Sequence, residues 1–355
     1  MIVKNESKVI KRCLESVSPW IDYWVIVDTG STDGTQKIIK QSLKGIPGEL
    51  HERPWVNFGH NRQEALTLAK AKGDYVLFID ADEVLTGALD KSSIKEDVYV
   101  VKVCTSKEPE LSLQRAFLIN NHLDWNWTGV LHESIHAPST VTKYGFLSGI
   151  EIEAIAKDGC RSQDPNKYKK DAELLEKALV DDPSNSTYVY YLAQSYFNAG
   201  EYALSLKNYQ KRAEMGGWDQ EVFWSKYLTA NIQEALGVKP EEFIKSYCSA
   251  FEYRPTRIEP LYRISNYFLR NGSAVLAYAI SKFALTIPMP TDIAYMENWI
   301  YTHGLLLDHA NSCCLIGKFK EAETAYRELL LKKEISKDLR LAIFERLDVL
   351  PKSDN

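Results

Sequence analysis

The sequence predicts an α/β domain with a mostly parallel sheet over residues 1–160, followed by an all-α helical repeat domain over residues 161–355. Two observations support this fold class. Short apolar runs typical of buried strands alternate with helical patterns from residue 2 to residue 79. After about Pro165 the strand signal stops, and a helix-turn-helix pattern recurs along the rest of the chain. A chain of 355 residues is long enough to give both domains a core.

The composition is typical of a globular protein, because 45% of the residues are hydrophobic and 26% are charged. The net charge of −5 argues against nucleic acid as the main partner, since phosphate binding usually needs a basic face. No apolar run is long enough for an integral membrane segment and no signal peptide is recognisable, so we expect a cytoplasmic protein. The six cysteines include no Cys-x-x-Cys pair, which favours reduced thiols over disulfides or zinc.

The elements of the first domain are predicted from apolar periodicity and from turn-forming residues. Asp33 and Gln36 resemble a capping box at the start of the second helix. Alternating strands and helices imply a mostly parallel sheet that is covered on both faces. In chain order, we expect a strand stub at 2–3, a helix at 7–17, a strand at 24–27, a helix at 35–43, a strand at 50–54, a helix at 57–72 and a strand at 75–79.

Carboxylates follow two of these strands. Asp28 ends the strand at 24–27, and Asp80 and Asp82 follow the strand at 75–79. Side chains two residues apart in an extended chain point the same way, so Asp80 and Asp82 can face one bound cation. Burying carboxylates without a partner is costly, and Mg²⁺ or Mn²⁺ holding phosphate oxygens would offset that cost. Ligands of such sheets bind at the carboxyl ends of strands, where all three acids fall. A solvated strand-end loop is the alternative.

Residues 90–155 have a less regular pattern. Residues 98–103 predict another strand, and a segment dense in aromatic and titratable groups follows at 125–133. His132 and Glu133 end this segment, so they could place an acid or a base beside the cation. Plain edge-strand packing is the other interpretation.

The second domain shows a repeat of about 34 residues, with small or aromatic residues at fixed offsets around a turn glycine. This is the tetratricopeptide pattern. A single helix pair cannot bury its apolar face, so such repeats stack into a solenoid with a concave surface. The copies contain Leu192, Ala193, Tyr196, Gly200, Tyr202, Ser205 and Tyr209; Ile264, Ser265, Phe268, Gly272, Ala274, Ala277 and Ser281; His309, Ala310, Cys313, Gly317, Phe319, Ala322 and Tyr326; and, more loosely, Gly237, Phe243, Tyr247, Ala250 and Pro255.

Four motifs of the first domain follow one another at intervals that resemble those of the family 2 glycosyltransferases. The branch with C-terminal tetratricopeptide repeats, which includes SunS-like peptide glycosyltransferases, is the most similar. The resemblance implies the GT-A fold, in which residues 80–82 are the Asp-x-Asp (DXD) motif. The motifs are Met1–Glu6, Val27–Thr35, Asn57–Arg62 and Asp80–Glu83.

This resemblance implies a nucleotide-sugar donor, with UDP favoured over GDP, and Mn²⁺ or Mg²⁺ as cofactor. The sugar would pass with inversion to a peptide, protein or glycan acceptor. Asp28 would accept the ring N–H of the donor's base, although it could instead cap the turn after it. Asn61 and Arg62 would lie near the base and ribose, and Val3 and Asp80 would complete the donor site. The repeats would hold the acceptor or a second subunit, giving a homodimer.

The resemblance also assigns the chemistry to residues 127–133. Inversion by direct displacement needs one base to take the acceptor's proton on the face opposite the leaving diphosphate. We expect Glu133 to be this base. We expect Asp80, Asp82 and His132 to be the metal ligands, with a structural role as the alternative for His132. Related sequences carry a histidine near residues 156–159, where this chain has none, so a third protein ligand is left open.

Two other functions fit parts of the sequence. A sugar nucleotidyltransferase also uses paired acids on an α/β sheet. Its triphosphate-binding loop after the first strand is rich in glycine and arginine, whereas Lys4–Ser7 contain no glycine here. A non-catalytic scaffold with a degenerate first domain would need only the repeats. The joint presence of Asp28, Asp80, Asp82 and Glu133 argues against such a scaffold.

Overall fold

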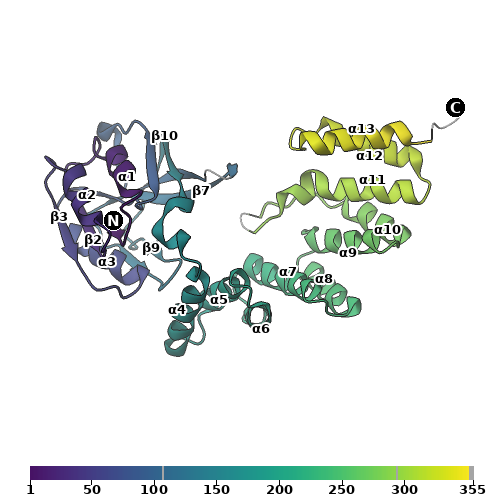
Figure 1. Ribbon diagram of the computed structural model, residues 1–355, viewed down its shortest axis with the longest axis horizontal. Helices are drawn as coiled ribbons and strands as arrows, with labels where there is room; N and C mark the ends of the chain where they lie inside the picture. Colours follow the sequence, from purple (N-terminus) through teal and green to yellow (C-terminus); the bar gives the residue numbers. More distant parts are fainter. Residues whose placement is uncertain (106–107, 293–294, 352–355) are drawn as a thin grey trace. The chain divides into compact units, whose positions relative to one another are not determined.

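The computed structural model describes residues 1–105, 108–292 and 295–351. Contacts divide the chain into two compact units, Met1–Asp181 and Asp182–Asn355. The first unit combines strands with helices and the second is helical, so the predicted fold class is confirmed (Figure 1). Helix α4 (Lys167–Asp181) follows the predicted domain boundary at residue 160 but belongs to the first unit.

Three parallel strands begin the first unit. Strand β2 lies between β1 and β3, and the register places Val3 beside Asp28. Helices α1 and α2 contribute Ile10, Leu14 and Ile39 to a shared apolar core with this sheet. The elements are β1 (Ile2–Val3), α1 (Ile10–Val17), β2 (Trp24–Asp28), α2 (Thr35–Ser42), β3 (Gly48–Glu52) and α3 (Phe58–Ala69).

Only one of the two hydrogen bonds of the expected capping box of α2 has a counterpart in the structure. Asp33 does accept the N–H of Thr35 at 3.0 Å, but the N-cap is Gly34, whose φ is 91°. The Gln36 side chain turns away from the helix start and donates to the Asp28 carboxylate. In a capping box this side chain would accept the N–H of the N-cap residue, whereas here its amide N–H donates to a charged acceptor, which makes a stronger hydrogen bond.

A second sheet, with five strands in the order β4-β7-β6-β10-β5, follows α3. Strands β6 and β10 are parallel, and the other neighbours are antiparallel. A cavity of about 410 Å³ is lined by residues of β1, β2 and β4. Within the described residues, the two sheets are not hydrogen-bonded to each other. The strands are β4 (Tyr75–Leu77), β5 (Glu83–Gly87), β6 (Val98–Thr105), β7 (Glu108–Asn120) and β10 (Tyr144–Ala154), with a separate ribbon of β8 (Asn126–Thr128) and β9 (Ser134–His136).

Strand β4 ends at Leu77, two residues earlier than the sequence predicts. The N–H of Phe78 still donates to the carbonyl of Phe117 at 2.8 Å, and the chain turns at Asp80–Glu83, where the N–H of Glu83 donates to the carbonyl of Asp80 at 3.1 Å. Asp80 and Asp82 therefore lie in the turn between β4 and β5 and not on an extended strand. Short 3₁₀ helices follow elsewhere at η1 (Lys91–Ser93), η2 (Ala156–Asp158) and η3 (Cys160–Gln163).

The second unit consists of helix pairs whose turns contain a glycine. Gly200, Gly237, Gly272 and Gly317 follow the first helix of each pair with φ between 70° and 79°. This left-handed conformation ends a helix at little cost when the residue is glycine. Tyr209, Tyr247 and Tyr326 are buried, as the repeat pattern predicts. The helices are α5 (Ser186–Asn198), α6 (Tyr202–Glu214), α7 (Asp219–Ala235), α8 (Pro240–Tyr253), α9 (Glu259–Arg270), α10 (Ala274–Ala284), η4 (Ile300–Gly304), α11 (Leu305–Leu315), α12 (Phe319–Leu331) and α13 (Lys337–Val349).

Two expectations from composition can be compared with the structure. The six cysteines are free thiols. Among the described helices, none has both the length and the apolar character needed to cross a membrane.

Candidate functional site

Asp28 closes the turn that follows β2. Its side chain is fully buried, and its Oδ1 accepts the N–H groups of Gly30 and Ser31 at 3.2 and 2.9 Å. Its Oδ2 accepts the amide of Gln36. The turn-capping role considered for Asp28 is therefore present in the structure. The contact of Asp28 with a donor base stays a prediction. Both Asp28 oxygens that could accept a hydrogen bond from the base already accept hydrogen bonds from the loop and from Gln36.

The Lys4–Glu6 loop is attached to this turn by hydrogen bonds. Asn5 has a φ of 57°, and its side-chain oxygen accepts the N–H of Thr32 at 2.8 Å. The N–H of Glu6 donates to Oγ1 of Thr35 at 2.8 Å. Val3 is buried, and its carbonyl accepts the N–H of Thr29 at 2.9 Å. These contacts hold the Lys4–Glu6 loop against the turn after β2, and Glu6 lies close enough to Asp82 for the charge of Asp82 to raise its pKa.

Arg62 joins the expected metal acid to the expected base. Its Nη2 lies 2.8 Å from Asp80 Oδ1, and its Nε lies 2.5 Å from Glu133 Oε1. The side chains of Arg62 and Glu133 are 15% and 13% exposed, so the bridge is shielded from water on most sides. The structure therefore brings together three residues that are far apart in the sequence. Among the described residues, both ion-pair partners of Arg62 are acids other than Asp28.

A second arginine supports the same turn. Arg115 forms a bidentate ion pair with Glu83 at 2.8 and 2.7 Å, and Glu83 Oε2 accepts the N–H of Asp80 at 2.9 Å. Burial raises the pKa of Asp80, but the charges of Arg62 and Arg115 outweigh burial and lower it overall. Asp80 is thus held as a carboxylate in a fixed orientation.

Glu6 and Asp82 are the acids without a cationic partner. Among the described residues, neither forms an ion pair, whereas Asp80 and Glu83 both do. Burial, followed by the charges of Asp82 and Asp33, raises the pKa of Glu6 to about 7. Burial and the charge of Asp80 likewise raise the pKa of Asp82. Carboxylates that lack a counter-charge are the ligand type that hard divalent cations take, so the chemistry of Glu6 and Asp82 suits Mg²⁺ or Mn²⁺. Within the described residues, the oxygens of Glu6, Asp80 and Asp82 do not all lie within 4.8 Å of one another.

The segment at 156–159 lies directly against Asp82. A Cβ placed on Gly159 would lie 2.8 Å from Oδ2 of Asp82, and the N–H of Cys160 donates to Glu6 at 3.2 Å. The resemblance leads to the expectation of a histidine near this segment, and residues 156–159 contain none. At this segment, the backbone of Gly159 and Cys160 therefore lies against Asp82 and Glu6, in the place where a metal-binding histidine was expected.

His132 is surrounded by charges from the end of the first unit. It has a φ of 53°, and burial lowers its pKa to about 4, with smaller effects from Asp171, Arg161 and Lys167. Arg161 forms an ion pair with Asp171 and lies 4.5 Å from the ring of Phe58. A neutral histidine can bind a metal, and the assignment of His132 as a ligand stays a prediction. The nearby Arg161 and Lys167 equally suit a phosphate.

Asn61 has a clear structural role. It is fully buried, its Oδ1 accepts the N–H of Val56 at 3.0 Å, and its amide donates to the carbonyl of Pro54 at 3.1 Å. Asn61 thus holds the loop before α3, and its predicted donor contact stays a prediction. Trp125 is 6% exposed and donates to the carbonyl of Asn120, which favours core packing.

Sequence reasoning missed Arg115 and the Arg161–Lys167 group as parts of the site. Arg115 lies in the stretch without a clear period, and only its pairing with Glu83 reveals a role. The charge of Asp82 acts on the pKa of Lys167, although the predicted boundary at residue 160 places Lys167 beyond the first domain. Glu6 could have been found, because it ends a motif that the sequence analysis had already identified.

Comparisons with known proteins identify the class of this domain. Residues 1–92 match the family described as Glycosyl transferase family 2, so the chain carries a family 2 glycosyltransferase domain. This match includes Asp28, Arg62, Asp80 and Asp82 but ends before Glu133.

The relatives agree with this assignment. The SPbeta prophage-derived glycosyltransferase SunS of Bacillus subtilis (strain 168) is 24% identical over 206 residues, which are 55% of this chain and 47% of that protein. An uncharacterized glycosyltransferase of Rickettsia bellii is 30% identical over 124 residues, covering 35% of this chain and 38% of the relative. The chain thus spans about half the length, or less, of these curated relatives. A solved fragment of a tetratricopeptide-repeat protein from Cytophaga hutchinsonii covers 48% of this chain and 61% of its own, with 16% identity and a TM-score of 0.38.

Proposed function

We propose that this protein is a metal-dependent inverting glycosyltransferase that moves a sugar from a nucleoside-diphosphate donor, with UDP favoured, to a peptide, protein or glycan. One observation carries the proposal. Glu6 and Asp82, which form no ion pair among the described residues, lie close enough to Asp80 for its charge to raise their pKa values, and Arg62 links Asp80 to Glu133. This arrangement would hold a cation and a carboxylate base in one site.

Asp80 and Asp82 would hold Mn²⁺ or Mg²⁺, with Glu6 or His132 as a further ligand. The cation would neutralise the charge on the donor's diphosphate. Glu133 would accept the proton of the acceptor nucleophile, because a carboxylate fixed by Arg62 is oriented before the acceptor arrives. Arg161 and Lys167 would add positive charge for the phosphates. Asp28, with Val3 and Asn61 behind the loops, would form the base pocket.

The Asp82 carboxylate should be needed for cation-dependent donor binding. In Asp82→Asn, we expect the affinity for UDP with Mn²⁺ to fall by at least about 2 kcal/mol, or roughly 30-fold, because an ionic ligand is lost. Titration calorimetry with UDP, with Mn²⁺ or with EDTA, measures this change.

Asp74→Asn is the matched control. Asp74 directly precedes β4, the strand that leads to Asp82, but its side chain is 86% exposed and pairs with His122. Its UDP affinity should equal that of the wild type. UDP binding that survives EDTA and is unchanged in Asp82→Asn would rule out the metal-bridged site.

The helical unit is proposed to hold the acceptor or a second subunit and to contribute nothing to donor binding. Residues 1–181, which form the first compact unit, should therefore bind UDP with Mn²⁺ as tightly as the full chain. Circular dichroism first shows whether the fragment is folded. A folded fragment that has lost UDP binding would contradict this division of roles.

A further inference from the structure

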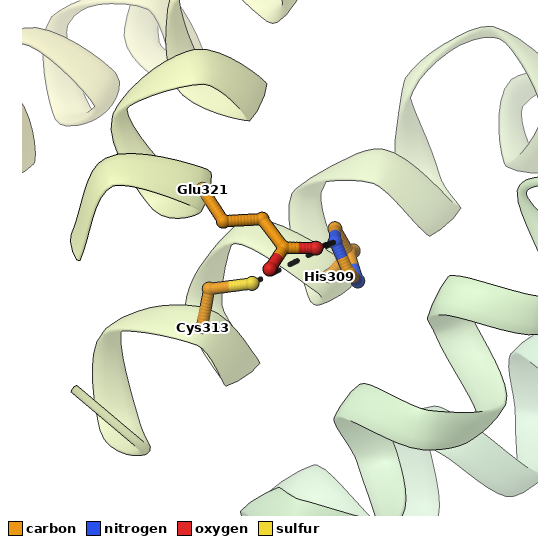
Figure 2. A group of neighbouring side chains, drawn as sticks. All are labelled: His309, Cys313 and Glu321. Carbon is orange, nitrogen blue, oxygen red and sulfur yellow. Dashed lines mark hydrogen bonds and ion pairs between the residues drawn. The ribbon is translucent and has the colours of Figure 1, made fainter. Parts of the chain in front are cut away.

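Three side chains with metal-binding atoms meet between α11 and α12 of the helical unit. His309 and Cys313 lie one turn apart on α11, and Glu321 faces them from α12 (Figure 2). Their ligand atoms all lie within 4.8 Å of one another. His309 and Cys313 are buried, at 5% and 0% exposed. This trio is separate from the acids of the first unit.

The trio interrupts the apolar pattern of the repeats. Aligned on the turn glycine, His309, Cys313 and Glu321 stand eight and four residues before Gly317 and four residues after it. Two of the other three pairs carry only apolar or aromatic residues at these positions, and the looser third pair carries polar residues, but only the α11–α12 pair has a histidine, a cysteine and a carboxylate there. The corresponding residues are Leu192, Tyr196 and Leu204 in the α5–α6 pair, Ile264, Phe268 and Leu276 in the α9–α10 pair, and Thr229, Gln233 and Glu241 in the looser α7–α8 pair.

The ring of His309 lies between a hydroxyl and two potential ligand atoms. Its Nδ1 lies 3.0 Å from Oγ of Ser281, and the hydroxyl of Ser281 also donates to the carbonyl of Tyr278 at 3.1 Å. Its Nε2 lies 3.3 Å from Glu321 Oε1 and 3.6 Å from Cys313 Sγ. Without an ion, Nε2–H can donate to the Glu321 carboxylate. In the tautomer with the proton on Nδ1, the Nε2 lone pair faces the same carboxylate oxygen and the thiol, and a divalent cation favours this tautomer because it binds the lone pair and the carboxylate together.

Two of the three ligand-atom separations match a tetrahedral zinc site. Zinc bonds of about 2.0 Å to nitrogen or oxygen and about 2.3 Å to sulfur place tetrahedral ligand atoms roughly 3.3 to 3.6 Å apart. The separations of 3.3 Å and 3.6 Å from Nε2 of His309 fall in this range, and the third pair, Cys313 and Glu321, lies within 4.8 Å. Metal-bound histidines also donate their other ring N–H to a neighbouring group, and Oγ of Ser281 is placed to accept it from His309.

We propose that His309, Cys313 and Glu321 bind one Zn²⁺ with water as the fourth ligand. The ion would fasten α12 to α11, and this role is independent of the glycosyl transfer proposed above. The sequence analysis disfavoured zinc because it found no Cys-x-x-Cys pair, but these ligands come from two helices and their spacing follows no such motif.

Lys282 is the competitor for this ion. Its ammonium lies 3.1 Å from Glu321 Oε1, and its side chain is 56% exposed, so it can turn into solvent when the ion binds. Tyr278 donates to Glu321 Oε2 at 3.0 Å and keeps the carboxylate in place. Lys282→Met should consequently bind zinc more tightly than the wild type.

Cobalt titration of the chelator-treated full chain tests the proposal, because Co²⁺ bound to a thiolate gives an intense charge-transfer absorption that oxygen ligands do not give. We expect this band to saturate at one Co²⁺ per chain and to disappear on addition of Zn²⁺, which binds such sites more tightly. Cys313→Ser should abolish the band and weaken Zn²⁺ binding at least about 100-fold, since even a residue that only supports a ligand contributes about 10- to 100-fold.

Cys314→Ser is the matched control, because this neighbouring thiol donates to Tyr326 and lies outside the trio. It should retain the band. The triple variant His309→Ile, Cys313→Phe and Glu321→Leu restores the residues of the α9–α10 pair; it should fold, bind no cobalt, and lack the rise in Tm that Zn²⁺ gives the wild type. A wild type without the band, a band that survives Cys313→Ser, or a band lost in Cys314→Ser would each overturn the proposal.

Discussion

Replacing Glu133 with Gln is expected to lower the rate of sugar transfer by about 10²- to 10⁴-fold, the usual contribution of a general base. Donor affinity should stay nearly constant, because the base meets the acceptor and not the diphosphate. Stability should also change little, since the amide oxygen of Gln can still accept from Arg62, which lies 2.5 Å from Glu133. Transfer rate, UDP affinity and Tm measured on one preparation separate these three effects.

Glu64→Gln is the control for this experiment. Glu64 also pairs with an arginine, at 2.9 Å from Arg53, and it accepts the amide of Asn61 at 3.4 Å, which Gln can still do. Among the described residues, it forms no hydrogen bond or ion pair with the acids of the site. Its transfer rate should be that of the wild type. Near-normal transfer by Glu133→Gln with intact UDP binding would eliminate Glu133 as the base. Weakened Mn²⁺-dependent UDP binding would instead identify it as a metal ligand.

The second large effect is expected for Arg62→Met, which should destabilise the first unit by about 3 kcal/mol when no divalent cation is present. The change leaves Asp80 and Glu133 without their shared guanidinium, and removing one partner of a buried ion pair costs about this much. Hydrogen exchange of peptides from β2, followed by mass spectrometry, reports the stability of this unit alone. Saturating Mn²⁺ should recover part of the loss, because the cation compensates Asp80.

Arg53→Met provides the comparison, because Arg53 and Glu64 form an ion pair whose side chains are 38% and 27% exposed. An exposed pair contributes about 0 to 1 kcal/mol. If Arg62→Met costs no more than Arg53→Met, the Arg62 bridge is screened by solvent and does not organise the site.

The sequence predicted the order of elements well wherever a local signal exists. The turn glycines of the helix pairs and the parallel pairing of β1 to β3 are determined by neighbouring residues. The second sheet was not foreseen, because β4 pairs with β7, about forty residues away, and periodicity carries no information about such partners. The placement of Asp80 and Asp82 in a turn likewise depends on a hydrogen bond between Asp80 and Glu83 that apolar periodicity does not reveal.

The site was predictable in its residue types but not in its pairing. Asp80, Asp82 and Glu133 were found from their positions after apolar runs. The role of Arg62 as a bridge between two acids is a consequence of the fold, as is the support that Arg115 gives to Glu83. Asp28 and Asn61 illustrate the opposite case, because the structure gives both a hydrogen-bonding role that a motif cannot distinguish from ligand binding.

The most direct test of the account is mass spectrometry of the products formed from a panel of nucleotide sugars and of peptide, protein and glycan acceptors. The account predicts that an acceptor gains the mass of one sugar, that EDTA abolishes the gain, and that Asp82→Asn and Glu133→Gln strongly reduce it. Formation of a nucleotide sugar from a sugar phosphate and a nucleoside triphosphate, with no modified acceptor, would contradict it and identify a nucleotidyltransferase instead.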